Sequence, residues 1–136
     1  MDTLTKAQRS AIMSRIRGKD TQPELFVRRL VHRAGYRYRL HRRDLPGTPD
    51  LVFPSRRKVI FVHGCFWHKH PGCPANRTPA SNRAYWQPKL LANRRRDRRN
   101  ERQLRAAGWR VQVIWECETE RPWTVAEAVS RFLSAR

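Results

Sequence analysis

The stretch Val59-Ile60-Phe61-Val62-His63-Gly64-Cys65-Phe66-Trp67-His68-Lys69-His70-Pro71-Gly72-Cys73 is central to this 136-residue chain. Its first four residues are apolar and mostly β-branched, a pattern typical of a buried strand. After the strand come histidines, thiols and adjacent aromatic side chains, for which a hydrophobic core has little use. The stretch therefore predicts a buried strand that ends in a functional site.

Helices and strands are expected on both sides of this stretch. Thr21 can cap a helix that has Pro23 in its first turn and ends at Gly35. The apolar run 51–53 and the strand 59–62 are joined by a short turn, which indicates an antiparallel hairpin. Further elements are predicted as strands at 36–40 and 109–115, a helix from Pro88 to about Ala107, and a last helix capped by Thr124. This order predicts an α/β fold with a mixed sheet and flanking helices.

One domain is expected at residues 20–136, preceded by a basic N-terminal arm at 1–19. The arm is interpreted either as a segment that orders on DNA or as a disordered tail. No apolar run is long enough for a membrane span, and the first residues lack the apolar region of a signal peptide. The cytoplasm is therefore the expected location, and a monomer is the default expectation.

The charge balance points to a polyanionic partner. Lys and Arg number 30 against 11 Asp and Glu, a formal net charge of +19. Nucleic acid relieves such self-repulsion through phosphate contacts and counterion release, and an anionic membrane surface is the competing interpretation. Most of the cations are arginine, which favours bidentate phosphate contacts. The arginine-rich segment 94–105 is either a solvated helix face or a contact with the DNA backbone.

The three cysteines favour a metal site over a disulfide framework, because their number is odd. Cys65, His70 and Cys73 lie close together in the sequence, and Cys117 ends a distant strand. Zinc prefers four tetrahedral sulfur and nitrogen ligands, which these residues can supply. The alternative is three unrelated thiols, and spacing alone does not decide whether His68 or His70 is the fourth ligand.

A second group of residues suits hydrolysis assisted by a hard metal. Asp50 stands at the mouth of a strand, where a carboxylate can hold Mg²⁺. His63 and His68 are candidate bases or acids, since imidazole titrates near neutrality. Glu24 is either the carboxylate of a capping box or a second acid near the metal.

Three aromatic side chains complete the candidate site. Phe66 and Trp67 lie in a turn, and Trp86 lies in a later loop. In a basic protein such rings can stack on bases or wedge between them. The alternative is that they pack over the zinc site.

The sequence resembles the very short patch repair (Vsr) family of DNA mismatch endonucleases over roughly residues 6–133. The resemblance is carried by Pro49-Asp50, by Phe61-Val62-His63-Gly64-Cys65-Phe66-Trp67-His68, by Gly18-Lys19-Asp20-Thr21 with Glu24, by Asp97-Arg98-Arg99, by Gly108-Trp109-Arg110-Val111 and by Trp115-Glu116-Cys117. It implies a restriction-endonuclease-like fold in which Phe61-Val62-His63 replaces the usual Glu-x-Lys.

The resemblance also implies an activity and its partners. Such enzymes nick one strand 5′ to the thymine of a T:G mismatch in a short sequence context. These mismatches arise from deamination of 5-methylcytosine, so a cytosine methyltransferase, a repair polymerase and a ligase are the expected functional partners. The rival functions are a non-catalytic zinc-stabilised DNA-binding module and a restriction-type nuclease on matched DNA.

The resemblance assigns roles to individual residues. It implies that Asp50 binds catalytic Mg²⁺, that His68 activates water, and that Glu24 and His63 support catalysis. Val62 stands where members often carry threonine, and a metal contact through its backbone carbonyl survives that change. The remaining implied roles are structural zinc binding by Cys65, His70, Cys73 and Cys117, and a wedge beside the mismatch formed by Phe66, Trp67 and Trp86. Lys69 and the Pro71-Gly72 pair depart from the histidine-rich run of the family.

Overall fold

The fold is built on one mixed sheet of four strands, seen in a computed structural model that describes residues 21–135. The expected N-terminal arm lies outside these residues. The strand order is β1 (Arg39–Leu40), β2 (Leu51–Phe53), β3 (Lys58–His63) and β4 (Arg110–Trp115). The pairs β1–β2 and β2–β3 are antiparallel, and β3–β4 is parallel. The predicted hairpin and the mixed sheet are therefore confirmed.

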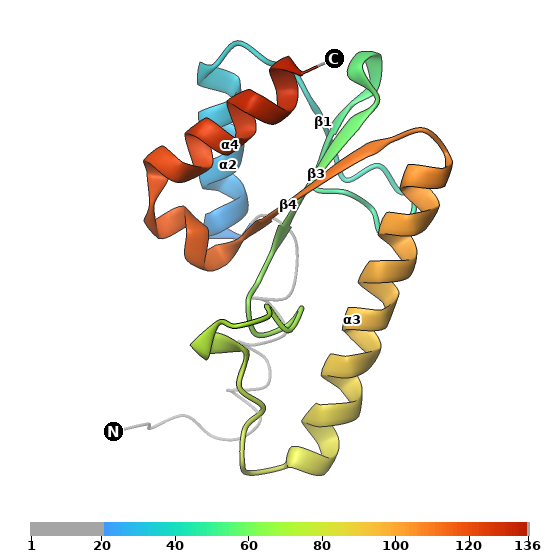
Figure 1. Ribbon diagram of the computed structural model, residues 1–136, viewed down its shortest axis with the longest axis vertical. Helices are drawn as coiled ribbons and strands as arrows, with labels where there is room; N and C mark the ends of the chain where they lie inside the picture. The colour runs from blue at the N-terminus through green and yellow to red at the C-terminus, as the bar shows by residue number, and fades with distance from the viewer. Residues whose placement is uncertain (1–20, 136) are drawn as a thin grey trace.

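Three helices in the described part of the chain cover the two faces of this sheet (Figure 1). Helices α2 (Gln22–Arg33) and α4 (Pro122–Ser134) lie together on one face, and α3 (Arg83–Ala106) lies on the other. Parallel strands need a crossover connection, and α3 supplies it between β3 and β4. Three short 3₁₀ helices complete the described elements: η1 (Pro54–Arg56), η2 (Pro74–Asn76) and η3 (Glu116–Glu120).

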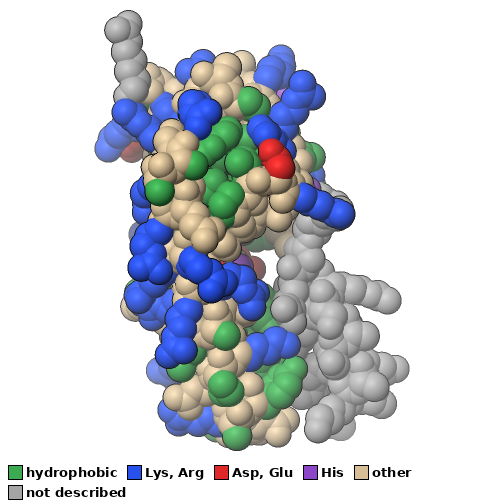
Figure 2. Space-filling model, turned by 90° about the vertical axis from the view of Figure 1, so that its right-hand side faces the viewer, with side chains coloured by type: hydrophobic (Ala, Val, Ile, Leu, Met, Phe, Trp, Pro, Cys, Tyr) green, Lys and Arg blue, Asp and Glu red, His purple; other side chains and the backbone are tan. Residues whose placement is uncertain are grey.

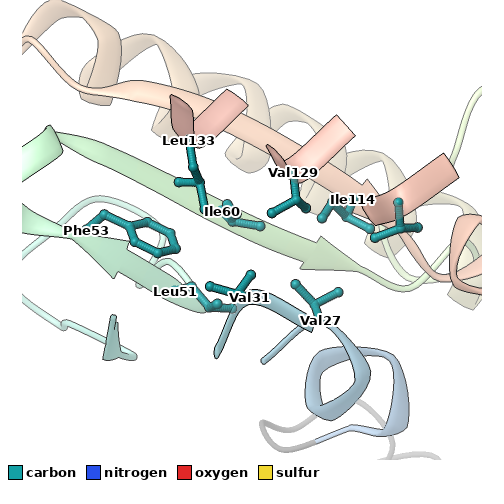
Figure 3. Packing of buried hydrophobic residues seen from close by; sticks show 9 residues of the cluster. Val27, Val31, Leu51, Phe53, Ile60, Ile114, Val129 and Leu133 are labelled. Carbon is teal, nitrogen blue, oxygen red and sulfur yellow. The ribbon is translucent and has the colours of Figure 1, made fainter. Parts of the chain in front are cut away.

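Two hydrophobic cores form because successive side chains of a strand point to opposite faces. Leu51 and Ile60 pack toward α2 and α4, where they meet Val31 and Val129 (Figure 3). The intervening side chains pack toward α3 in a second cluster, which consists of Val52, Val59, Phe61, Leu104 and Trp109. The central strands β2 and β3 are thus buried on both faces, which fixes the positions of the residues at their ends.

The structure corrects three predicted boundaries. The strand expected at 36–40 shortens to β1, which pairs only with Leu51 and Val52 at the edge of the sheet. Helix α3 starts at Arg83, so Pro88 lies inside it instead of starting it. Pro88 lies beyond the first four residues of the helix, so its missing N–H leaves one intrahelical hydrogen bond unmade and α3 continues past it. Helix α4 begins at Pro122, not after Thr124, because proline is preorganised for the first helical position.

Positive charge dominates the face of the molecule that carries α3. Figure 2 shows many Lys and Arg side chains along this face and few acidic ones. The arginines of α3 classed as exposed are Arg83, Arg95, Arg96, Arg98, Arg99, Arg102 and Arg105. No helix within residues 21–135 combines the length and apolar character needed to cross a membrane.

Candidate active site and metal-ligand cluster

Asp50 lies directly before β2, between its two neighbouring strands. The register that pairs Leu40 with Leu51 places His41 opposite Asp50, and the His41 backbone N–H donates to the Asp50 carbonyl at 3.5 Å. On the other side, the Val62 backbone N–H donates to Asp50 Oδ2 at 2.7 Å. Burial raises the pKa of Asp50 well above its ordinary value, and the Val62 N–H opposes this rise. A partly buried carboxylate whose ionised form is disfavoured suits a bound cation.

Glu24 reaches the same point from helix α2. Its backbone N–H donates to Thr21 Oγ1 at 3.4 Å, which confirms the predicted cap residue. Its side chain is 3% exposed, and Glu24 Oε2 accepts hydrogen bonds from Arg28 and from His41 Nε2, the latter at 3.1 Å. The carboxylate therefore extends to Arg28 and His41, beside Asp50.

Two histidines at the end of β3 form a stacked pair. The rings of His63 and His68 lie 3.9 Å apart between centroids and are nearly parallel. His68 Nδ1 lies 2.6 Å from Asp97 Oδ2, on helix α3. An ionised carboxylate only accepts hydrogen bonds, so Nδ1 carries the proton and Nε2 is left with a lone pair. Burial, reinforced by nearby His68, lowers the pKa of His63 to about 3, which keeps this imidazole uncharged near neutrality.

Sequence patterns did not single out three residues of this site: Arg28, His41 and, as a partner of His68, Asp97. The available signal for Asp97 was its spacing from Asn93 and Asn100, which puts three polar side chains on one helix face in an arginine-rich segment. No comparable local signal exists for His41, because strand pairing brings it to Asp50.

The three thiols and His70 converge in a second cluster at the ends of β3 and β4. All four ligand atoms lie within 4.8 Å of one another. His70 Nδ1 is 3.6 Å from Cys65 Sγ and 3.5 Å from Cys117 Sγ. A tetrahedral zinc site requires a sulfur-to-nitrogen separation of about 3.6 Å, given zinc bonds of about 2.3 and 2.05 Å. The spacing of these atoms therefore fits zinc, and His70 faces the thiols while His68 faces Asp97.

The pKa values of two thiols in this cluster also bear on cation binding. Burial raises the pKa of the Cys65 thiol to about 12, and burial also raises the pKa of Cys117. Burial therefore favours the protonated thiols of Cys65 and Cys117 when no metal ion is bound. A metal ion reverses this preference, because a coordinating thiol is deprotonated.

Trp115 lies between the two clusters. Its position at the end of β4 follows from the register, which pairs it with His63. Its ring stacks on His70 at 4.1 Å and meets His63 edge-on at 5.3 Å. The indole therefore separates the thiol cluster from the stacked histidines and packs against both.

The predicted wedge residues Phe66, Trp67 and Trp86 form one cluster beside the turn at 65–73. Trp86 lies 5.4 Å from Phe66 and 5.6 Å from Trp67 between ring centroids, and all three side chains are partly exposed. Asn93 Nδ2 donates to the Trp67 carbonyl at 3.2 Å, which ties the turn to α3. Tyr85, which is 57% exposed, extends the cluster toward solvent.

Carboxylates and a histidine–aspartate pair at the same end of two central strands, in so basic a protein, are typical of a nucleic-acid hydrolase. The family model described as DNA mismatch endonuclease Vsr matches residues 1–73. This chain belongs to the Vsr family and is a DNA endonuclease.

Several relatives cover most of the chain. The type II nicking enzyme V.XorIIP of Xanthomonas oryzae is 58% identical over 86% of this chain and 85% of its own length. The DNA mismatch endonuclease Vsr of Escherichia coli is 41% identical over 85% and 74%. The type II nicking enzyme V.NmeAIP of Neisseria meningitidis is 37% identical over 97% and 94%. The non-catalytic alternative is therefore set aside.

Proposed function

We propose that this endonuclease nicks one DNA strand 5′ to the thymine of a T:G mismatch and so initiates very short patch repair. The observation that carries the proposal is the hydrogen bond between His68 and Asp97 just after β3, the strand whose Val62 N–H donates to the carboxylate of Asp50. The relatives, which include a mismatch endonuclease and nicking enzymes, support the choice of reaction. A cytosine methyltransferase, a repair polymerase and a ligase are the partner activities in this proposal.

His68 acts as the general base. Asp97 holds the imidazole in the tautomer that presents Nε2, which takes a proton from the attacking water. His63 stacks on this ring and stays uncharged, so it restricts the orientation of His68 without adding a competing positive charge. Glu24 and His63 are thus supporting groups around the base and the carboxylate.

Asp50 and the backbone carbonyl of Val62 would hold Mg²⁺. The residues fit this ion, because Asp50 is a largely buried carboxylate and hard cations prefer oxygen ligands. When bound, the ion stabilises negative charge on the phosphate and on the leaving 3′ oxygen. Val62 contacts Asp50 through its backbone N–H, and the proposed metal contact uses its backbone carbonyl. Neither contact involves the side chain, so valine can replace the threonine often found here in the family.

Cys65, His70, Cys73 and Cys117 would hold a structural zinc ion. The match between the sulfur–nitrogen distances and tetrahedral coordination supports this assignment. All four positions are filled by protein ligands, as in a closed structural site. Gly72, at φ +74°, allows the tight turn between His70 and Cys73.

Phe66, Trp67 and Trp86 form the wedge that opens the mismatched step. Their shared cluster is partly exposed and lies at the start of α3, whose arginines supply phosphate contacts. Unstacking a base step requires a few kcal/mol, which is least at a mismatch. The wedge therefore favours mismatched over matched DNA.

Nicking of paired duplexes tests the proposed substrate. With Mg²⁺, we expect the strand carrying thymine in a T:G duplex to be cut about 10- to 100-fold faster than the same strand in a C:G duplex, since one altered base pair contributes about 1–3 kcal/mol. Denaturing electrophoresis of end-labelled strands measures both rates. Equal cutting of both strands in matched DNA would instead identify a restriction-type nuclease.

The variant Asp97→Asn tests the proposed base. The amide no longer fixes the tautomer of His68, so the single-turnover nicking rate is expected to fall about 100-fold or more. Binding to T:G DNA should be unchanged, because the substitution preserves the volume of the side chain. Glu101→Gln, one turn further along α3, is the matched control, and equal rates for the two variants would contradict the role of Asp97.

A further inference from the structure

His41 contacts both acids of the proposed Mg²⁺ site. His41 Nε2 lies 3.1 Å from Glu24 Oε2 and 3.9 Å from Asp50 Oδ1. The His41 side chain is 17% exposed, so its ring is largely enclosed by its neighbours. In this contact the carboxylate oxygen of Glu24 accepts and His41 Nε2 donates.

The backbone holds His41 in a conformation that side chains rarely adopt. Its φ is +46°, in the left-handed region. Non-glycine residues in this region are uncommon, and the surrounding structure must maintain them. Here the His41 N–H donates to the Asp50 carbonyl, which extends the pairing of β1 with β2 by one residue. The ring is thereby aimed at Asp50 and Glu24.

Glu24 is held from two directions. Arg28 approaches from the next turn of α2, and His41 approaches from the sheet. Arg28 compensates the charge of Glu24 within the helix, whereas His41 ties this carboxylate to the strand that carries Asp50. Loss of His41 leaves the salt bridge within α2 intact but removes the hydrogen bond that joins Glu24 to the connection between β1 and β2.

We propose that His41 is a positioning residue of the nicking site, which sets the separation of the Glu24 and Asp50 carboxylates that surround the catalytic cation. This inference rests on the proposed function of Asp50. Groups that orient metal ligands usually change metal affinity or activity by about 10- to 100-fold when removed. The same range applies here, because the His41 ring bridges a proposed ligand and its supporting acid.

His41→Ala and His41→Gln separate positioning from simple packing. We expect His41→Ala to bind Mn²⁺, a probe of the Mg²⁺ site, about 10-fold more weakly in calorimetric titration of the DNA-free protein. Its nicking rate at saturating T:G DNA should fall by a similar factor and recover partly at high Mg²⁺. His41→Gln retains an N–H donor and should restore most of both quantities. His32→Ala, an exposed histidine on the same helix as Glu24, is the control.

The outcomes distinguish this inference from the proposed function. If wild type neither binds Mn²⁺ nor nicks T:G DNA with Mg²⁺, the proposed function fails. If wild type does both and His41→Ala matches it, or if folded His41→Gln is no better than His41→Ala, the positioning role of His41 is overturned. Melting temperature and zinc content identify a variant that has not folded. In that case His41→Leu, which fills similar space without an N–H donor, takes the place of His41→Ala, and Mn²⁺ binding as tight as in wild type would overturn the inference.

Discussion

Asp50→Asn is expected to abolish Mg²⁺-dependent nicking, with a fall of about 1,000-fold or more in the single-turnover rate. The amide keeps the shape of the side chain and an oxygen for the Val62 N–H, but it removes the negative charge that is proposed to hold the cation. The charge developing on the phosphate then loses its largest stabilisation. Rates on a T:G duplex across a range of Mg²⁺ concentrations measure the effect.

Asp50→Asn should remove the charge of the side chain without disturbing the fold. Because burial disfavours the ionised form of Asp50, the variant should melt at the same temperature as wild type or higher. Asp44→Asn is the matched control, since Asp44 is an exposed carboxylate of the preceding loop that pairs with Arg42. Wild-type nicking by folded Asp50→Asn would remove Asp50 from the proposed mechanism.

Cys117→Ser is expected to lose the bound zinc and to lower the melting temperature strongly. Structural zinc contributes apparent free energies of about 10 kcal/mol or more, comparable to the whole stability of an ordinary domain. Cys117 is the only ligand of the proposed site that comes from outside the turn at 65–73, so its loss removes the metal link between that turn and η3. Nicking should fall with zinc content, because this turn also carries His68.

Elemental analysis and thermal unfolding measure the two consequences. Wild type should contain about one zinc per chain, in keeping with four protein ligands in a closed site. Glu116→Gln, the exposed neighbour of Cys117, serves as the control and should retain metal and stability. A folded, zinc-free wild type, or a Cys117→Ser protein with full metal and activity, would refute the zinc site.

Local patterns in the sequence predicted the parts of the molecule whose partners are near in the chain. The buried strand β3 and its hairpin with β2 follow from apolar residues bounded by a turn, and Cys65, His70 and Cys73 converge because they share one tight turn. The pairs Glu24–His41 and His68–Asp97 were missed since they join distant segments. Their meeting depends on the register of β1 with β2 and on the face that α3 turns to the sheet.

Helix α3 is continuous from Trp86 to Asp97. These residues lie about three turns apart, a separation of about 16 Å along the helix axis. If Trp86 helps to open the base step of the DNA and Asp97 orients the general base His68, α3 sets the distance between these two residues. The interval between a mismatch and its cut would then depend in part on the number of helical residues between Trp86 and Asp97. Exposed arginines of α3 could diversify without moving the incision, whereas adding or deleting one residue would turn Asp97 by about 100° relative to Trp86.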